Sequence, residues 1–479
     1  MQIDLQKPFK IDSIYYDGKM YINDPAKPYY NDGNVWFIPL PKDPLNSIHT
    51  IGIVYHGIPR PAITPPWDGG WIWSKDEKGR PWMTVACQGL GASVWYPCKD
   101  HQSDEPDNGA SITITVPDDL VAVANGRLKE KRSQNGSTSW TWEVKSPINN
   151  YNIVPYIGKY VNFSDTYDGE KGKLDLNYWV LDYNLDKAKK QFDQNVKPML
   201  KSFEYWFGPY PFYEDGFKMV ESSHLGMEHQ SAIAYGNHYV NGYYPGFGNS
   251  GMDLSGSGWG LKWDYIIIHE AGHEWFGNNI TTNDIADMWV HEGFTDYSET
   301  LFVESLFGKK AADEYTQGLR NNIQNDAPII GPYGVNKEGS SDMYYKGNNV
   351  IHTIRQVIND DELFRNILRG MNKDFYHKTV NSLDVEKYIS ERSGKDLSKV
   401  FDQYLRTTKI PVLEYKIQGD KISYRWNNCV TEFAMPVKLK IADEWLYPTT
   451  DWKQTNGTAD LINNFDIDKN FYIIVKKVK

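Results

Sequence analysis

The chain has 479 residues, which is enough for about three domains whose cores need no disulfide bonds. Its 51 basic and 62 acidic side chains give a formal net charge of −11 without a long run of one sign, which excludes a nucleic-acid-binding surface. No stretch of about 18 apolar residues occurs, so we expect a soluble protein without a transmembrane segment. The three cysteines (Cys87, Cys98 and Cys429) are too scattered for a disulfide framework and are expected to be buried or free thiols.

The first third of the chain is predicted to form strands. SITITVP (111–117) and WTWEV (140–144) alternate apolar and polar residues with the period of a strand. Asn-Gly pairs at 125–126 and 135–136 each predict a β-hairpin. The opening MQIDLQKPFK lacks the apolar core of a signal peptide. The compartment therefore stays open between the cytoplasm and export with a removed signal.

The pattern changes near residue 165, and the middle of the chain is predicted to be mainly helical. Residues 185–208 place six apolar side chains on one helical face: Leu185, Ala188, Phe192, Val196, Leu200 and Phe203. Pro198 inside this segment predicts a kink or a boundary. Further helical patterns run from 261 to about 408.

A Gly/Ser-rich stretch at 242–260 (GYYPGFGNSGMDLSGSGWG) predicts a long loop. We hypothesise that it borders a cleft as a lid, and the alternative is a passive surface insertion. At the end of the chain, LEYKI and ISYRW flank Gly419-Asp420 and are followed by VKLKI and FYIIV. These runs predict a small β-sandwich, which we interpret as structural rather than as a binding module.

The stretch HEAGHEWFGN carries a metal-ligand pattern. His269 and His273 are four residues apart in an apolar context of helical type, a spacing that stacks both imidazoles on one face of a helix. Glu270 lies about 100° round that helix, where it can contact a metal-bound water without being a ligand. Glu292 follows His273 after 18 residues in a second helical segment and can supply a third ligand. Two imidazoles and one carboxylate form the usual donor set of catalytic Zn²⁺, so we expect one zinc ion per chain.

Neighbouring residues are assigned lesser roles. Glu274 is expected to point into solvent, and His291 to be a neighbour of the site rather than a ligand. Asp296 and Glu299 return to the helix face of Glu292, and ligating imidazoles usually donate their second N–H to a carboxylate. These two acids are therefore the candidates to orient the ligands.

HExxHxWFGN followed by Glu-Gly-Phe resembles the M1 family of zinc aminopeptidases, and three distant segments extend the resemblance. LGMEHQSAIAYG (225–236) is similar to the family's G-x-M-E-N motif and DMYYKGNNVIHTI (342–354) to its Y-x-K-G segment. CQGLGASVWYPCKDHQSDEPD (87–107) is similar to its glutamine-containing stretch. The passage at 394–415 also resembles the family's transition into a β-sandwich.

The resemblance implies roles for single residues. Glu228 would bind the free α-amino group of a substrate, and Gly226, Met227 and Gln88 would line the substrate site. Tyr344 would stabilise the tetrahedral intermediate, although Tyr345 beside it makes the register ambiguous.

The sequence departs from the family pattern at three places. His229 stands where the family has Asn, and Leu225 stands where a small residue is usual. The N-terminal domain is expected to lack the family's first strands, and the large C-terminal helical domain of many members is expected to be absent.

The resulting prediction is an α+β multidomain protein. It assigns an N-terminal β-sheet domain to 1–167, a thermolysin-like zinc catalytic domain to 168–409 and a small β-sandwich to 410–479. The predicted function is that of an aminopeptidase acting on peptides with a free N-terminus, with Glu270 as the general base. Two alternatives remain, a thermolysin-like zinc endopeptidase and a catalytically silent peptide-binding protein. The preferred residue, the native substrate and the oligomeric state are not predicted.

Overall fold

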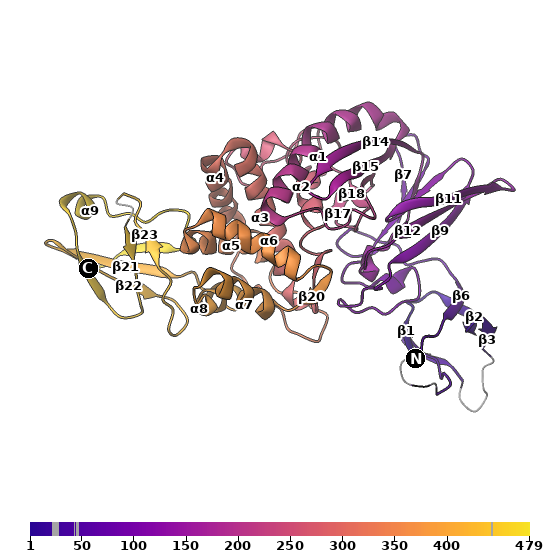
Figure 1. The fold of residues 1–479 in the computed structure, drawn as a ribbon, viewed down its shortest axis with the longest axis horizontal. Helices are drawn as coiled ribbons and strands as arrows, with labels where there is room; N and C mark the ends of the chain where they lie inside the picture. Colours follow the sequence, from indigo (N-terminus) through magenta and orange to yellow (C-terminus); the bar gives the residue numbers. More distant parts are fainter. Residues whose placement is uncertain (22–27, 43, 45–46, 442–443) are drawn as a thin grey trace. The chain divides into compact units, whose positions relative to one another are not determined.

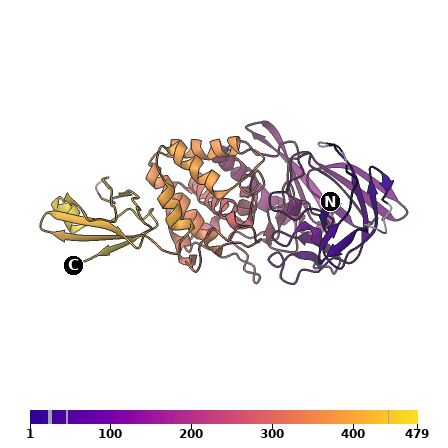
Figure 2. The same cartoon turned by 90° about the horizontal axis from the view of Figure 1, so that it is seen from below.

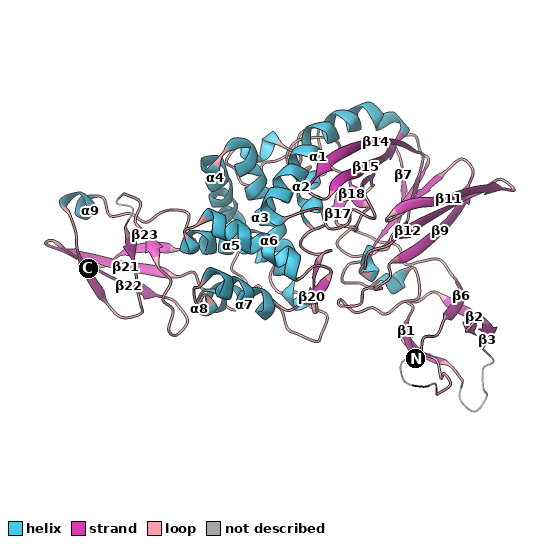
Figure 3. Ribbon diagram, in the orientation of Figure 1, coloured by secondary structure: helices cyan, strands magenta, loops and turns pink. Residues whose placement is uncertain are grey.

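Strands dominate the first part of the chain and helices its middle (Figures 1 and 3). The computed structural model describes residues 1–21, 28–42, 44, 47–441 and 444–479. The described chain separates into two units. Unit 1 contains Met1–Thr166, Asp175–Asp186 and Phe212–Gly236, and unit 2 contains Tyr167–Leu174, Lys187–Pro211 and Asn237–Lys479. The predicted α+β multidomain class is confirmed, whereas the division into 1–167, 168–409 and 410–479 stays a prediction.

The strands up to residue 236 form several small sheets and one five-stranded sheet, in which the order is β14-β15-β16-β18-β17. Their bounds are β1 (Gln2–Asp4), β2 (Lys10–Tyr16), β3 (Lys19–Met20), β4 (Tyr30–Asp32), β5 (Val35–Phe37), β6 (Ile51–His56), β7 (Gly70–Lys75), β8 (Pro81–Ala86), β9 (Ala110–Pro117), β10 (Val121–Val123), β11 (Arg127–Gln134), β12 (Ser137–Val144), β13 (Tyr156–Gly158), β14 (Tyr160–Gly169), β15 (Gly172–Leu181), β16 (Phe217–Glu221), β17 (Gly226–Met227) and β18 (Ile233–Tyr235).

The core of unit 1 follows from alternation along its strands. Trp140 and Trp142 of β12 lie opposite Ile114 and Ile112 of β9, and both tryptophans are buried. The predicted strands at 111–117 and 140–144 are therefore confirmed. The hairpin at Asn135-Gly136 is confirmed too, because this pair joins β11 to β12 with both residues at positive φ.

The hairpin predicted at Asn125-Gly126 is wrong. β10 pairs with β13 and β11 pairs with β12, so the two strands that flank this pair are not neighbours. The buried amide of Asn125 donates instead to the carbonyl oxygens of Asn152 (2.8 Å) and Gln230 (2.6 Å). At this position the asparagine links segments that are distant in sequence instead of forming a hairpin turn.

Helices form most of unit 2, together with the two-stranded parallel sheet of β19 and β20. Their bounds are α1 (Leu185–Phe207), α2 (Tyr265–Gly272), β19 (Ile280–Thr282), α3 (Trp289–Phe307), α4 (Lys309–Leu319), α5 (Tyr345–Ile358), α6 (Asp361–Asp374), β20 (Lys378–Val380), α7 (Ser382–Ser393) and α8 (Ser398–Leu405). Among the described residues, none of these helices has the combination of length and apolar character needed to cross a bilayer.

Helix α1 buries the predicted apolar face, with Leu185 only partly covered. Pro198 lies inside this helix and does not end it, so a boundary at this position is excluded. A proline removes the hydrogen bond to the carbonyl four residues earlier. That residue is Gln194, which is exposed, so water can satisfy the carbonyl.

Residues 410–479 return to strands, drawn in yellow in Figure 2. β21 and β22 pair antiparallel across Gly419-Asp420 and form a sheet in the order β25-β22-β21-β26, and β23 pairs with β24. The bounds are β21 (Val412–Gln418), β22 (Lys421–Asn427), β23 (Val437–Lys438), β24 (Trp445–Leu446), β25 (Lys453–Asn456), α9 (Ala459–Asn463) and β26 (Ile474–Lys477).

Candidate metal centre

Helix α2 presents two imidazoles from a fully buried segment. Asp264 caps its first turn by accepting a hydrogen bond from the backbone N–H of Ile267 (3.3 Å). His269 lies within the helix, and His273 follows its last residue with helical dihedrals (φ −62°, ψ −21°). The four-residue spacing therefore keeps helical geometry up to the second imidazole.

Helix α3 brings a carboxylate to the same place. It packs against α2 where Gly272 meets Ser298, and a Cβ atom at Gly272 would lie only 2.6 Å from the hydroxyl oxygen of Ser298. Glycine thus permits a close helix crossing. Glu292 lies in the first turn of α3.

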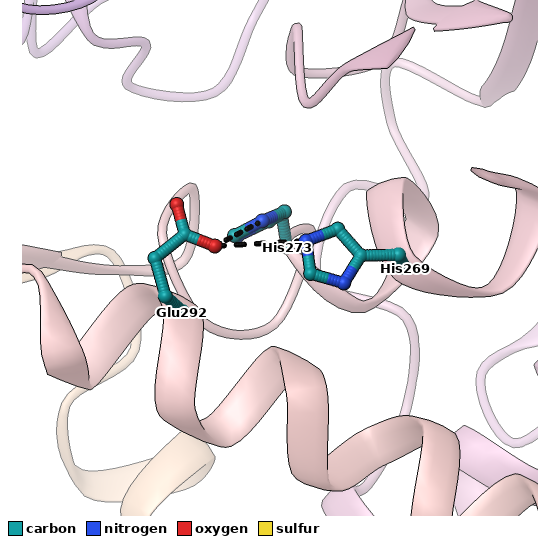
Figure 4. Close-up of side chains that lie close together, drawn as sticks. All are labelled: His269, His273 and Glu292. Atoms are coloured by element: carbon teal, nitrogen blue, oxygen red, sulfur yellow. Dashed lines mark ion pairs between the residues drawn. The ribbon is translucent and has the colours of Figure 1, made fainter. Parts of the chain in front are cut away.

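The three donor groups converge (Figure 4). Oε2 of Glu292 lies 3.6 Å from Nε2 of His269 and 3.3 Å from Nε2 of His273, and all three residues are buried. Ligands about 2.0–2.1 Å from a tetrahedral ion are separated from one another by roughly 3.3 Å. The observed spacings are therefore those of a group that can share one ion.

The outer nitrogens of both imidazoles are already engaged. Nδ1 of His269 lies 2.7 Å from Oε1 of Glu299, and Nδ1 of His273 lies 3.0 Å from the backbone oxygen of Phe276. Donation of the Nδ1 proton in each ring leaves the Nε2 lone pair directed toward Glu292. Two imidazole lone pairs and a carboxylate fit Zn²⁺ as a donor set.

The two acids proposed to orient the ligands, Asp296 and Glu299, have different neighbours. Glu299 bonds His269 and also accepts a hydrogen bond from the hydroxyl group of Tyr315 (2.6 Å). A carboxylate oxygen of Asp296 lies within 4.8 Å of donor atoms of His269 and Glu299. Burial, together with the neighbouring Glu299 carboxylate, raises the pKa of Asp296 well above its usual value.

Aromatic side chains surround the first imidazole. The ring of Tyr265 stacks on His269 with 5.2 Å between ring centroids, and the ring of Tyr344 lies 6.0 Å from it. Tyr344 is the residue immediately before α5, where Gly347 packs against Gly293 of α3. This tight crossing ties the tyrosine to the helix of Glu292.

Glu270 is buried on α2, and a tyrosine of the Gly/Ser-rich loop lies in its electrostatic range. Burial and then the charge of Glu270 raise the pKa of Tyr243. Tyr243 also exchanges backbone hydrogen bonds with Met252, so the loop doubles back on itself beside α2. Neither Tyr243 nor Tyr265 had a sequence signal, because neither belongs to a motif with metal-ligand spacing.

The other two members of the His-Glu pairs, His291 and Glu274, are both buried. Nε2 of His291 accepts a hydrogen bond from the backbone N–H of Thr282 (2.9 Å), and burial lowers the pKa of His291 to about 3. This neutral ring anchors the start of α3 to β19 and is not part of the donor group. Glu274 was expected in solvent and is instead fully buried, which corrects that prediction.

Unit 1 holds a second acidic group. Oε1 of Glu228, a buried residue, accepts hydrogen bonds from Nε2 of Gln88 (2.6 Å) and from the hydroxyl of Tyr151 (2.9 Å). Gly226 and Met227 form β17 just before it and pair antiparallel with β18. Tyr151 had no sequence signal, because it reaches Glu228 from 77 residues away.

His229, which follows Glu228, is held inside the core of unit 1. Its Nδ1 lies 2.6 Å from the hydroxyl oxygen of Tyr156, and that hydroxyl donates to the carbonyl oxygen of Ala232 (2.7 Å). Because the hydroxyl proton is used, Nδ1 is the donor to the oxygen. Burial lowers the pKa of His229 well below its usual value, so the ring is neutral.

Two helices that present two imidazoles and a carboxylate define this chain as a candidate metalloprotein. Comparison with known families matches residues 192–404 to the peptidase family M1 domain. Those residues, which carry the whole donor group, therefore form a domain of peptidase family M1.

The similarity to curated relatives extends over more residues than this domain. The chain is 25% identical over 372 residues to Aminopeptidase M1 of Arabidopsis thaliana, a match that covers 74% of this chain and 40% of the relative. It is 28% identical over 346 residues to Aminopeptidase N of Lactococcus lactis, covering 68% of this chain and 39% of the relative. The matches thus span less than half the length of these two relatives.

Solved structures share the fold. An M1 zinc metallopeptidase mutant from Deinococcus radiodurans, bound to a Tyr-Ser-Ala substrate, superimposes with a TM-score of 0.69 at 18% identity and covers 86% of this chain and 87% of its own. Legionella pneumophila aminopeptidase A in complex with aspartic acid gives a TM-score of 0.74 at 17% identity and covers 100% of this chain and 55% of its own.

Proposed function

We propose that the chain is a zinc-dependent aminopeptidase that removes N-terminal residues from peptides. The observation that carries the proposal is the buried group of His269, His273 and Glu292, with Glu270 on α2, the helix that holds His269 and ends directly before His273. The curated relatives are named aminopeptidases, which supports the same reading.

Each candidate site residue of unit 2 has a defined role in the proposed reaction. Zinc held by His269, His273 and Glu292 would act as a Lewis acid and lower the pKa of a bound water toward ~7. Glu270 takes a proton from the attacking water and delivers it to the leaving amine. Tyr344 donates a hydrogen bond to the carbonyl oxygen as negative charge develops on it.

Glu228 makes the proposed enzyme an exopeptidase. Its carboxylate binds the ammonium group of the peptide, which fixes the first peptide bond as the one that reacts. Gln88 and Tyr151 orient this carboxylate through their hydrogen bonds, and Gly226 and Met227 line the same substrate site.

The proposal is tested by hydrolysis of a panel of aminoacyl-anilides, with and without a zinc chelator. We expect chelator-sensitive release that collapses in Glu228→Ala and in Glu270→Gln. Glu130→Ala, at an exposed position of β11, serves as the control and should leave the rate unchanged.

Two outcomes would contradict the proposal. Cleavage of N-blocked peptides as fast as free ones, unaffected by Glu228→Ala, would identify an endopeptidase. A zinc-loaded chain that hydrolyses no anilide or peptide but still binds peptides would identify a catalytically silent binding protein.

A further inference from the structure

Unit 2 contains a cavity of about 420 Å³ that none of the residues of the proposed reaction lines. Its walls come from the end of α1 and the residues after it, from the turn between β14 and β15, and from the C-terminal half of α6. Binding sites for small molecules have volumes of about 300–1,000 Å³. The cavity is therefore large enough for a small organic ligand.

The interior of the cavity is mainly apolar. Phe207, Pro209 and Pro211 contribute one wall, and the ring of Tyr376 contributes another. The hydroxyl group of Tyr376 donates to the carbonyl oxygen of Pro211 (2.8 Å), which fixes the ring against the proline segment. A hydrocarbon or aromatic group would bury apolar surface between these walls.

The charged residues that line the cavity all have the same sign. Lys171, Arg369 and Lys373 line it, and none of its lining residues in the described chain is acidic. This is an unusual grouping in a chain with a net charge of −11. A cluster of cations around an apolar interior favours a ligand with a negative charge at one end.

The three cations differ in how far they are already neutralised. Arg369 forms a bidentate pair with Glu170, at 2.9 and 2.7 Å. The ammonium group of Lys171 lies 4.9 Å above the ring of Tyr376. Among the described residues, the exposed ammonium group of Lys373 has neither an ion-pair partner nor a hydrogen-bond partner, so it is the cation that a ligand would neutralise first.

Two asparagine side chains that line the cavity are held in place by hydrogen bonds. Nδ2 of Asn279 donates to the side-chain oxygen of Asn372 (3.1 Å), and its Oδ1 accepts from the backbone N–H of His377 (3.0 Å). The backbone N–H of Asn279 donates to the carbonyl oxygen of Glu274 (3.1 Å). The cavity is thus preformed, which reduces the entropy that a ligand loses on binding.

We propose that this cavity binds a small amphipathic monocarboxylate, with an aromatic or alkyl group between Phe207, Pro211 and Tyr376. The carboxylate faces Lys373 and Lys171 at the rim. The site is separate from the residues assigned to peptide hydrolysis and does not depend on that assignment.

Calorimetric titration of the full zinc-loaded chain with 4-phenylbutyrate and with its uncharged analogue 4-phenylbutyramide tests the proposal. We expect one site per chain and an affinity for the carboxylate about two- to fivefold above that for the amide, as an exposed ion pair supplies. Lys373→Glu should lower the affinity for the carboxylate about tenfold and leave that for the amide unchanged. Lys395→Glu, an exposed lysine outside the cavity, is the matched control and should change neither.

A carboxylate can also bind a catalytic metal, so the titration is repeated after chelation. The proposal expects binding to persist there and to remain sensitive to Lys373→Glu. It is overturned if the amide binds as tightly as the acid, if Lys373→Glu has no effect, or if neither probe binds. It is also overturned if binding disappears with the metal, since the probe would then occupy the metal centre. These outcomes are independent of whether any peptide is hydrolysed.

Discussion

The hydrogen bond between His269 and Glu299 holds the imidazole of a metal ligand in place. The contribution of the Glu299 charge to metal binding can be tested by substitution. Glu299→Gln keeps the shape of the side chain but removes the negative charge that the Nδ1–H of His269 contacts at 2.7 Å. Loss of such a partner typically weakens metal binding by about 10–100-fold. We expect this loss in a competition titration against a chromophoric chelator. Glu362→Gln, at an exposed position of α6, should retain the original affinity, and an unchanged affinity in Glu299→Gln would refute the role.

The tyrosine doublet can be resolved in the same way. Tyr344 has its ring 6.0 Å from that of His269, which favours it over Tyr345 as the donor to the reacting carbonyl. Removal of one such donor costs about 10²–10³ in rate. We expect Tyr344→Phe to lower kcat by that factor with unchanged zinc content, and Tyr345→Phe to have a small effect. The reverse order in steady-state kinetics would shift the assignment by one residue.

At the residue scale, spacing in the sequence predicted the group that the structure brings together. His269, His273 and Glu292 converge because two helical periodicities can be read locally. Glu274 was misplaced because periodicity gives the direction of a side chain but not what packs over it. Tyr151 and Tyr243 could not be predicted, since tertiary packing alone brings them near Glu228 and Glu270.

Among the elements, the crossing of α3 and α5 depends on two glycines. A Cβ atom at Gly347 would lie 2.9 Å from the Cα atom of Gly293, and backbone atoms cannot move aside as a flexible side chain can. We expect Gly347→Ala to destabilise the fold by about 1–3 kcal/mol in urea unfolding, despite the better helix propensity of alanine. In the control Gly370→Ala, the new methyl group meets the far end of the Tyr388 side chain rather than backbone atoms and should cost less. Equal stability of both variants would show that α3 and α5 can move apart without a cost in stability.

The Gly/Ser-rich loop supports a separate prediction about a lid. Residues 246–250 are exposed, whereas Tyr243 and Met252 close the base of the loop through backbone hydrogen bonds. Deletion of 246–250 therefore leaves this base and Tyr243 in place. If the loop is a lid, kcat for anilides should fall while the unfolding midpoint is retained. An unchanged kcat would identify a passive insertion.

Element prediction succeeded where one signal decided the outcome. The face of α1 and the hairpin at Asn135-Gly136 follow from local patterns. The same Asn-Gly signal failed at residue 125, because the buried amide of Asn125 bonds segments that lie far away in sequence. Pro198 did not end α1 because the hydrogen bond that it removes is to the carbonyl of an exposed residue, Gln194.

At the scale of the whole molecule, the metal should stabilise one unit more than the other. All three donor residues belong to unit 2, so a bound ion adds its binding free energy to the folding of that unit. At a zinc concentration of about 1,000 times Kd this amounts to about 4 kcal/mol. Hydrogen exchange with and without a chelator should show lost protection in α2 and α3 and unchanged protection in β9 and β12. Equal loss in both units would mean that they unfold as one.

The route of the chain through the two units has a consequence for biosynthesis. The chain passes between them after residues 166, 174, 186, 211 and 236, and unit 1 receives its last piece only at 212–236. That piece supplies β16 and β18 to the five-stranded sheet and the carbonyl oxygen of Gln230 to Asn125. A nascent chain on the ribosome therefore cannot complete the five-stranded sheet and the rest of unit 1 until residue 236 has emerged from the exit tunnel. By then all of α1 is already outside. A contiguous gene fragment that contains all of one unit consequently also contains segments of the other, since residues 1–236 include α1 and residues 167–479 include β16 to β18.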